Sequence, residues 1–457
     1  MKRFFAFAVL AALLMACSEP ELPENENKDD QGQTEQPADL TPLKLSVPVT
    51  NNWIYEGQPE ITISAENLNE VSQEAKVKVY FYTDKKKQLD IVEFTEEIPA
   101  KSTKEIKVKP NVTLEPGFYR TTCGVNGKIA RSFVFGVSPE LIVSAPDMQP
   151  DFAEFWQAAK DQLAAIDMNP VLTEITSKSS STRKVYLVEL QSVPDGLTGE
   201  PVTVRGYYCE PQDGEKHPVI FHFYGYDDQK PTSKASCPSG GSSKYAEFYF
   251  SIRGQMLNNR PANLREPDGK GDFVNIYGDW FAHNFGDKDS YYYRGAFMDC
   301  VQAVRFIATR PTSDMTQLFA EGSSQGGALC YATAALSDYP FTAIAPNVAF
   351  LGDFPDYFDI VSWPGSTARD NQGSMTDDEM FAFLSYFDTK NLATRISCAV
   401  WATSGLQDGT CPPHTNIAPF NNLKSTDKVM NYYPEMKHEY PDNWSYDTNK
   451  FFKDRMK

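Results

Sequence analysis

The chain has 457 residues, a formal net charge of −18 at pH 7 and a hydrophobic content of 41%. This length exceeds what a single hydrophobic core usually supports, so two domains are expected. The hydrophobic content is that of a globular protein, and the negative charge argues against a nucleic-acid partner, because a phosphate backbone would be repelled. A neutral, hydroxyl-rich ligand such as a sugar would not be repelled.

The first residues predict an export signal. Lys2 and Arg3 precede the apolar run FFAFAVLAALLMA, which is too short to be a comfortable membrane span. The run ends in Leu-Met-Ala-Cys, which resembles a bacterial lipobox, a signal cleaved before its lipidated cysteine. We therefore predict a signal peptide at 1–16, lipidation at Cys17, and an exported protein anchored to the bacterial cell envelope, on the periplasmic or outer side of the outer membrane. A plain secretory signal with a chance cysteine is the alternative.

The segment after the signal predicts a tether. Residues 17–40 are rich in Glu, Asp, Asn, Gln and Pro and almost free of apolar side chains. Such a segment cannot bury enough surface to order itself, and its charges extend it. We interpret it as a flexible acidic link between the membrane and the folded protein.

The remaining seven cysteines do not indicate a metal site. None of them has C-x-x-C spacing, so zinc is not suggested and no metal is predicted. Export permits disulfides, but an odd number leaves at least one thiol unpaired within the chain.

Residues 41–140 predict an all-β domain. Short alternating segments are separated by turn residues every eight to twelve positions, which is typical of an immunoglobulin-like β-sandwich. Examples are LKLSVPV, EITISAEN, AKVKVYFYT, KEIKVKP, GFYRTTCGV and ARSFVFGV. Four aromatic residues of this region, namely Trp53, Tyr55, Tyr80 and Tyr82, either fill the sandwich core or stack on sugars. In the first case the domain is a spacer, and in the second it is a binding module.

Residues 145–457 alternate between strands and helices. HPVIFHFYGY and YAEFYFSIRG read as continuous apolar strands of the buried, parallel type, and RKVYLVELQSV with TVRGYYCEP as a hairpin. PDFAEFWQAAKDQLAAI and RGAFMDCVQAVRFIATRP have helical spacing. This alternation predicts an α/β fold with a mostly parallel sheet.

A G-x-S-x-G motif lies in the middle of this region. Gly322-Ser323-Ser324-Gln325-Gly326 follows the apolar strand QLFAEG and opens the helix QGGALCYATAALS. In α/β-hydrolases this context holds the nucleophilic serine on a sharp strand-to-helix turn. Glycines at the outer positions let the chain turn sharply and let strand and helix pack closely. Ser324 is therefore the predicted nucleophile.

A serine hydroxyl needs a base, and in this fold the order along the chain is Ser, then Asp or Glu, then His. Only His414 and His438 follow Ser324. The strand ISCAVWATSG leads to Asp408, and the next strand, KVMNYYPEM, is followed directly by His438. We predict His438 as the base and Asp408 as the carboxylate that orients it. His414 follows Asp408 in the same loop, without an intervening strand, and is the alternative base.

The oxyanion hole requires two backbone N–H groups that point at the developing negative charge. One is expected from Gln325, the residue after the nucleophile. The other is expected from the loop after the third strand of the fold, which is YGYDDQ at 224–229. Gly225 permits a tight turn there, and Tyr226 is the predicted second donor.

At this point the sequence resembles a known family, that of acetyl xylan esterases and cephalosporin C deacetylases (carbohydrate esterase family 7). The resemblance runs in family order from about residue 150 to 457. It is carried by YGY at 224, RGQ at 253, YYYRGAFMDCVQAV at 291, GSSQGG at 322, NVAFLGDFPD at 347, YFDTKNLATRISC at 386, GLQDGTCPP at 405 and HE at 438. It implies an α/β-hydrolase that removes acetyl groups from xylo-oligosaccharides and other small acetylated compounds, without a cofactor. By the family pattern Ser324, Asp408 and His438 form the triad, and Tyr226 and Gln325 donate to the oxyanion.

The chain also departs from the family. Met256 and Ser323 stand where the family usually has glycine, and residues 256–290 differ from the expected pattern. That segment is well placed to rim the substrate site, which leaves the acyl and sugar preference open. The resemblance implies a ring-like homo-oligomer, which the additional β-domain at 41–140 could block. For Arg253 a structural salt bridge beneath the site is preferred to a substrate contact.

Three other functions share parts of this pattern. An esterase for longer acyl or aromatic esters would use the same catalytic residues. A peptidase of the same fold is disfavoured by the lack of a propeller-like repeat. A surface glycan-binding lipoprotein with an inactive esterase domain would not be expected to keep Ser324, Asp408 and His438 together.

Overall fold

The computed structural model describes residues 40–195, 199–226, 236–238, 244–258 and 277–457. The predicted signal peptide and Cys17 lie outside these residues, as does nearly all of the predicted tether. Residues Leu43–Lys457 form one compact unit. Within the described ranges, no helix combines the length and the apolar character needed to cross a membrane.

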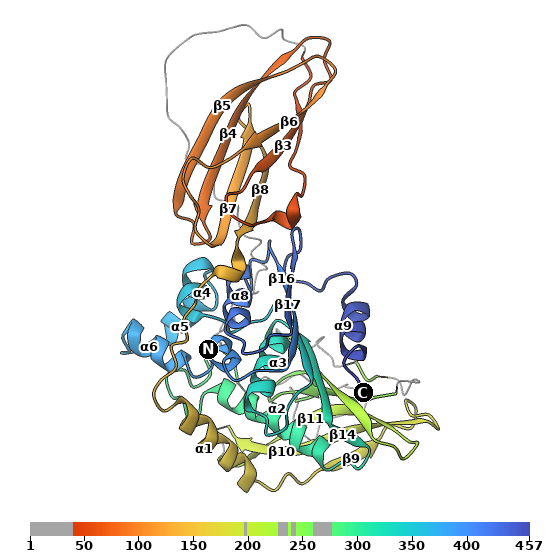
Figure 1. Cartoon of the computed structure of the whole chain (residues 1–457). Coiled ribbons are helices and arrows are strands. Elements are labelled where there is room, and N and C mark those ends of the chain that lie inside the picture. Colours follow the sequence, from red (N-terminus) through yellow and green to blue (C-terminus); the bar gives the residue numbers. More distant parts are fainter. Residues whose placement is uncertain (1–39, 196–198, 227–235, 239–243, 259–276) are drawn as a thin grey trace, which may run out of the picture. The chain divides into compact units, whose positions relative to one another are not determined.

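Residues 44–137, all described, fold into two β-sheets (Figure 1). One sheet has the order β1-β3-β6 and the other β2-β8-β7-β4-β5. The bounds are β1 Lys44–Ser46, β2 Ile54–Tyr55, β3 Ile61–Glu66, β4 Gln73–Thr83, β5 Gln88–Ile98, β6 Thr103–Val108, β7 Gly117–Val125 and β8 Lys128–Val137. Their pairing is antiparallel except between β2 and β8.

The sandwich core follows the period-2 pattern of the strands. Along β4, Val77, Val79 and Phe81 are buried, whereas the residues between them are not. Trp53 and Tyr55 belong to this buried core, so they cannot stack on a sugar. Tyr80 and Tyr82 lie on the opposite face of β4 and stack on each other at 6.2 Å between ring centroids. The core-filling interpretation is therefore right for Trp53 and Tyr55 and wrong for Tyr80 and Tyr82.

The second region is built on a large, mostly parallel sheet. Over the described residues its strand order is β17-β16-β15-β14-β12-β13-β11-β10-β9. The strands from β13 to β17 pair in parallel, and β9, β10 and β11 form an antiparallel edge that includes the predicted hairpin. The bounds are β9 Val171–Glu174, β10 Arg183–Pro194, β11 Pro201–Pro211, β12 His217–Phe223, β13 Ala246–Ser251, β14 Ser313–Ser323, β15 Ala343–Asn347, β16 Ala399–Gly405 and β17 Lys428–Tyr433.

Helices cover both faces of this sheet. The bounds are α1 Phe152–Ala165, α2 Tyr292–Ala308, α3 Gln325–Leu336, α4 Phe354–Ile360, α5 Gly365–Asn371, α6 Asp377–Leu384, α7 Thr389–Ala393, α8 Pro413–Asn421 and α9 Trp444–Lys453. Phe221 and Phe223 of β12 pack on the face that carries α2 and α3, whereas Ile220 packs with Trp444 and Phe452 of α9. Because β12 is covered on both sides, it reads as a continuous apolar run. This layered arrangement is the α/β-hydrolase fold.

Candidate active site

Ser324 lies on a sharp turn between β14 and α3. Its backbone has φ 58° and ψ −121°, an unfavourable conformation for a residue with a Cβ. The turn is held because Ser324 donates its N–H to the carbonyl of Asn347, while the carbonyl of Ser324 accepts from Phe350. The turn thus places the hydroxyl at the carboxyl end of the parallel strands, where ligands bind in open α/β sheets.

The two motif glycines are required by close packing rather than by unusual dihedral angles. A Cβ on Gly326 would lie 2.3 Å from the carbonyl oxygen of Phe223, and one on Gly322 would lie 2.6 Å from the backbone of Gly326. A Cβ atom does not approach a non-bonded atom this closely, so only glycine fits at either position. The predicted close packing of strand and helix is therefore present.

The structure brings the three predicted triad residues into one hydrogen-bonded chain. The Oγ of Ser324 lies 2.9 Å from Nε2 of His438, and Nδ1 of His438 lies 2.8 Å from Oδ2 of Asp408. Oδ1 of Asp408 accepts from the N–H groups of Thr410 and Cys411 at 2.8 and 2.9 Å. The carboxylate is thus buried but fully hydrogen-bonded, and it faces the imidazole with one oxygen.

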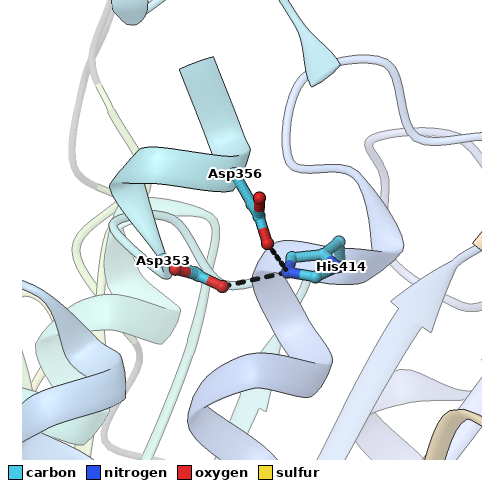
Figure 2. A group of neighbouring side chains, drawn as sticks. All are labelled: Asp353, Asp356 and His414. Carbon is cyan, nitrogen blue, oxygen red and sulfur yellow. Dashed lines mark hydrogen bonds and ion pairs between the residues drawn. The ribbon is translucent and has the colours of Figure 1, made fainter. Parts of the chain in front are cut away.

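His414, the alternative base, is bound to two other carboxylates and not to Ser324 or Asp408. Its Nε2 contacts Oδ2 of Asp353 at 2.9 Å and Oδ2 of Asp356 at 3.0 Å (Figure 2). Burial by itself would lower the pKa of the His414 imidazole, but the hydrogen bonds to these two carboxylates outweigh it and raise the pKa to about 9. A cationic imidazole bound to two carboxylates is not available as a base for Ser324.

Among the residues that the structure describes, Asp353, Asp356 and His414 form the one group whose ligand atoms lie close enough together, within 4.8 Å, to hold a metal ion. All three side chains are already engaged. Lys390 donates to Asp353 at 2.9 Å, and Lys85 pairs with Asp356. A metal ion would have to displace two ammonium groups and an imidazolium, so this group is an ion-pair network rather than a metal site.

The two predicted oxyanion donors are held by buried side chains. The Oε1 of Gln325 accepts a hydrogen bond from the hydroxyl of Tyr293 at 2.9 Å. The buried amide of Gln255 donates to the carbonyls of Tyr224 and Gly225, at 3.2 and 2.6 Å, and so holds the loop that ends in Tyr226. Gln255 belongs to the RGQ motif, whose glutamine thereby acts on this loop.

Tyr226 is fixed from the other side by the segment that follows residue 276. Its hydroxyl donates to Oδ1 of Asp279 at 3.0 Å and accepts from the N–H of Trp280 at 3.2 Å. Its ring packs against the rings of Trp280 and Trp363, at 4.8 and 5.6 Å between centroids. The sequence predicts that this divergent segment lies at the rim of the site, and its residues Asp279 and Trp280 contact Tyr226. Residues 259–276 lie outside the described residues.

Arg253 makes the structural ion pair expected of it. It is buried and donates to both oxygens of the fully buried Asp299, at 2.7 and 2.9 Å, and to the carbonyl of Val193. Asp299 projects from α2, so the pair joins the segment after β13 to that helix.

Three positioning groups were not found from the sequence. They are Asn347, which binds the hydroxyl of Ser323 beside Ser324, Asp279, which binds the hydroxyl of Tyr226, and Gln407, which binds the carbonyl of Pro434. For Asn347 a signal existed, because it is a buried amide at the end of an apolar strand that lies beside β14. For the other two the partners are distant in sequence, and no local pattern names them.

The seven cysteines within the described residues are unpaired. Burial raises the pKa of the Cys123 thiol to about 12 and that of Cys209 to about 12. Buried neutral thiols of this kind act as small apolar side chains.

Comparison with known proteins agrees with the geometry. Residues 143–456, more than half of the chain, match the family model described as acetyl xylan esterase (AXE1). The acetyl esterase Axe7A of Xylanibacter ruminicola is 26% identical over 392 residues, which cover 83% of either chain.

Two solved structures share the fold. The acetyl xylan esterase of Paenibacillus sp. R4 is 23% identical, with a TM-score of 0.57, and the alignment covers 69% of this chain and 98% of that one. Acetyl xylan esterase 1 of Thermoanaerobacterium sp. JW/SL YS485 is 24% identical, with a TM-score of 0.56, and the alignment covers 70% of this chain and 98% of that one. The chain therefore belongs to the acetyl xylan esterase family and is a carboxylic ester hydrolase of the serine esterase type.

Proposed function

We propose that this protein removes O-acetyl groups from xylo-oligosaccharides and related small acetylated compounds. The observation that carries the proposal is the uninterrupted hydrogen-bonded chain from Ser324 through His438 to Asp408, in a member of this family. The substrates named for its relatives, acetylated xylan and acetyl esters, support the same choice.

In this mechanism His438 takes the proton of Ser324 as the hydroxyl attacks the acetyl carbonyl. Asp408 holds the imidazole in the tautomer that presents Nε2 to Ser324, and it stabilises the imidazolium that forms. The sugar leaves as an alcohol, protonated by His438. Water then attacks the acetyl-enzyme by the same route and releases acetate.

The developing oxyanion is assigned to the backbone N–H groups of Tyr226 and Gln325. Gln325 opens α3, so its N–H lies at the positive end of a helix dipole. In comparable sites the loss of one such donor raises the activation barrier by roughly 3 kcal/mol.

The first test is acetate release by the protein without its first 40 residues. Acetylated xylo-oligosaccharides, acetylated polymeric xylan and a butyryl ester are compared, with Ser324→Ala as the control. We expect fast release from the short acetylated sugars, and a loss in Ser324→Ala of the order of 10⁶-fold, as for other serine hydrolase nucleophiles. Wild-type turnover in Ser324→Ala would refute the assignment of the nucleophile.

The comparison of the acetylated sugars with the butyryl ester distinguishes this proposal from its main alternative, a carboxylesterase of different specificity. Activity on the butyryl ester alone would keep the triad and overturn the sugar assignment. The other alternative is a glycan-binding lipoprotein with an inactive esterase domain. It predicts no turnover of any of these esters, and it is disfavoured by the intact hydrogen-bonded triad.

We further propose that the protein is exported and anchored to the cell envelope through a lipid on Cys17. The support is the lipobox-like Leu-Met-Ala-Cys after an apolar run with two preceding basic residues. Labelling with a fatty acid and membrane fractionation test it, with Cys17→Ser as the control. Retention of the lipid label in Cys17→Ser would contradict the anchor. Sedimentation of the tether-free protein tests the homo-oligomer that the family resemblance implies.

A further inference from the structure

The residue just before Asp408 is hydrogen-bonded to the N-terminal sandwich. The side-chain Oε1 of Gln407 accepts from the N–H of Val134 at 2.9 Å, and its Nε2 donates to the carbonyl of Val134 at 3.1 Å. Val134 lies in β8, where it stands opposite Arg120 of the neighbouring strand β7. The amide of Gln407 thus satisfies a backbone N–H and a backbone carbonyl of β8, as a further strand would do.

The same residue also holds the loop that carries His438. Nε2 of Gln407 donates to the carbonyl of Pro434 at 2.7 Å, and its backbone N–H donates to the carbonyl of Met436 at 3.0 Å. The two loops approach closely at Gly405, where a Cβ would lie 2.5 Å from the carbonyl oxygen of Met436. Gln407 therefore joins three segments: β8 of the sandwich, the loop of Asp408 and the loop of His438.

Other contacts of the sandwich reach the same two loops or the helices beside them. Arg131 of β8 pairs with Glu435 at 2.7 Å, and its guanidinium lies over the ring of Trp53 at 4.6 Å. From the turn between β4 and β5, Lys85 pairs with Asp356 of α4, and Asp84 lies 3.9 Å from Nδ1 of His414 in α8. These contacts hold the sandwich against the side of the hydrolase region that carries Asp408 and His438.

We infer that the sandwich is part of the catalytic apparatus and that Gln407 is its positioning residue. The sandwich fixes the distance between Asp408 and His438 through Gln407, and so keeps the imidazole aligned with Ser324. This inference rests on the proposed roles of Asp408 and His438. It assigns a task to the N-terminal domain, in place of a spacer or a sugar-binding module.

The geometry explains why a catalytic effect is expected. Gln407 is directly bonded to Asp408 along the chain, and Met436 is two residues from His438, so a shift at Gln407 moves both partners of one hydrogen bond. The Nδ1 to Oδ2 distance is 2.8 Å, so a lengthening by about 1 Å would take it beyond the range of a hydrogen bond. A displacement of about 1 Å at a catalytic group costs up to roughly a hundredfold in rate.

The test uses the full chain with Gln407→Met, which keeps the length of the side chain and removes its three side-chain hydrogen bonds. The matched control is Asn421→Ala. This variant also removes hydrogen bonds donated by a side-chain amide, here to the carbonyls of Pro139 and Ile142 in the segment that follows the sandwich. Asn421 contacts neither triad loop. We expect kcat to fall roughly tenfold or more in Gln407→Met with KM within about twofold, and to stay unchanged in Asn421→Ala.

A spectroscopic readout separates positioning from a general loss of stability. The proton shared by His438 and Asp408 gives a low-field NMR signal in such triads, and we expect it to shift or broaden in Gln407→Met while Asn421→Ala keeps the wild-type signal. Gln407→Asn, whose shorter side chain cannot reach Val134 and Pro434 together, replaces the first variant if that one does not fold. Wild-type kcat and an unchanged signal in the folded variant would overturn the inference. An active Ser324→Ala would instead overturn the proposed function.

Discussion

The side-chain amide of Asn347 donates a hydrogen bond of 2.7 Å to the hydroxyl of Ser323, the residue directly before the proposed nucleophile. The same Nδ2 donates to the carbonyl of Glu439 at 3.1 Å, directly after His438. Its Oδ1 accepts from the hydroxyl of Thr403, and the amide is fully buried. One amide thus connects the turn of the nucleophile with the loop of the base.

Replacing Asn347 with Leu should therefore affect both stability and rate. The change has similar volume but leaves the carbonyl of Glu439 and two hydroxyls without their partner, so we expect the free energy of unfolding to fall by about 2–4 kcal/mol. We also expect a lower kcat, because Ser324 and His438 lose a shared support. Urea unfolding and steady-state kinetics measure the two effects. Ser323→Ala, which removes only one of the bonds, is the control, and equal effects of the two changes would contradict this account.

The buried pair of Arg253 and Asp299 predicts a large loss of stability. Burial alone would lower the pKa of the Arg253 guanidinium, but the charge and hydrogen bonds of Asp299 outweigh burial and raise the pKa. Asp299→Asn would leave this buried cation without its counter-charge, at a cost of about 3–5 kcal/mol in the free energy of unfolding. Arg310→Met, which breaks a more exposed pair with Glu210, should cost less. A change below about 1 kcal/mol in Asp299→Asn would show that the pair is not what holds these segments.

The contact between Asp279 and Tyr226 predicts a kinetic effect. Tyr226→Phe removes the hydroxyl that bonds Asp279 and Trp280 but keeps the backbone N–H assigned to the oxyanion. We expect kcat/KM for an acetyl ester to fall about five- to tenfold, equivalent to about 1–1.5 kcal/mol, because two hydrogen bonds that hold Tyr226 are lost.

Asp279→Ala supplies the control for this pair. Because both variants remove the hydrogen bond between Tyr226 and Asp279, the loss in the double variant should be smaller than the sum of the two single losses. Additive losses would mean that the two residues act separately.

The raised pKa of His414 predicts that the free energy of unfolding falls as the pH rises. Its pKa of about 9 in the folded protein lies above its ordinary value of 6.5, so protonation favours the folded state. This contribution is complete below about pH 6.5 and is lost as the pH rises through 9. The free energy of unfolding of the wild type minus that of His414→Gln should therefore be larger at pH 6 than at pH 9.5, by about 1–3 kcal/mol. An equal difference at both pH values would show that the pKa of His414 is the same in the folded and the unfolded protein. His222, whose pKa is also raised to about 9, titrates in both proteins and cancels from the difference.

Much of the fold followed from patterns within short windows. The apolar runs of β12 and β14 and the helical spacing of α1 and α2 place these elements correctly, because burial on one or two faces leaves a period in the residues themselves. Strand β5 was missed. Its outer position in the sheet leaves it largely exposed, and QLDIVEFTEEI carries four acidic residues, so the alternation of apolar residues is masked.

What the sequence by itself determined is the identity of the chemical groups and their order along the chain. G-x-S-x-G between a strand and a helix, a carboxylate after a later strand and a histidine after the next were sufficient to nominate Ser324, Asp408 and His438, because parallel strands end at the same edge of a sheet. Only the tertiary structure decided which histidine lies 2.9 Å from Ser324 and that His414 is instead bound to two carboxylates. It alone also showed that Gln407 reaches β8, a contact between residues 273 positions apart. Such pairs have no local signature, since their geometry is set by the packing of segments that are distant along the chain.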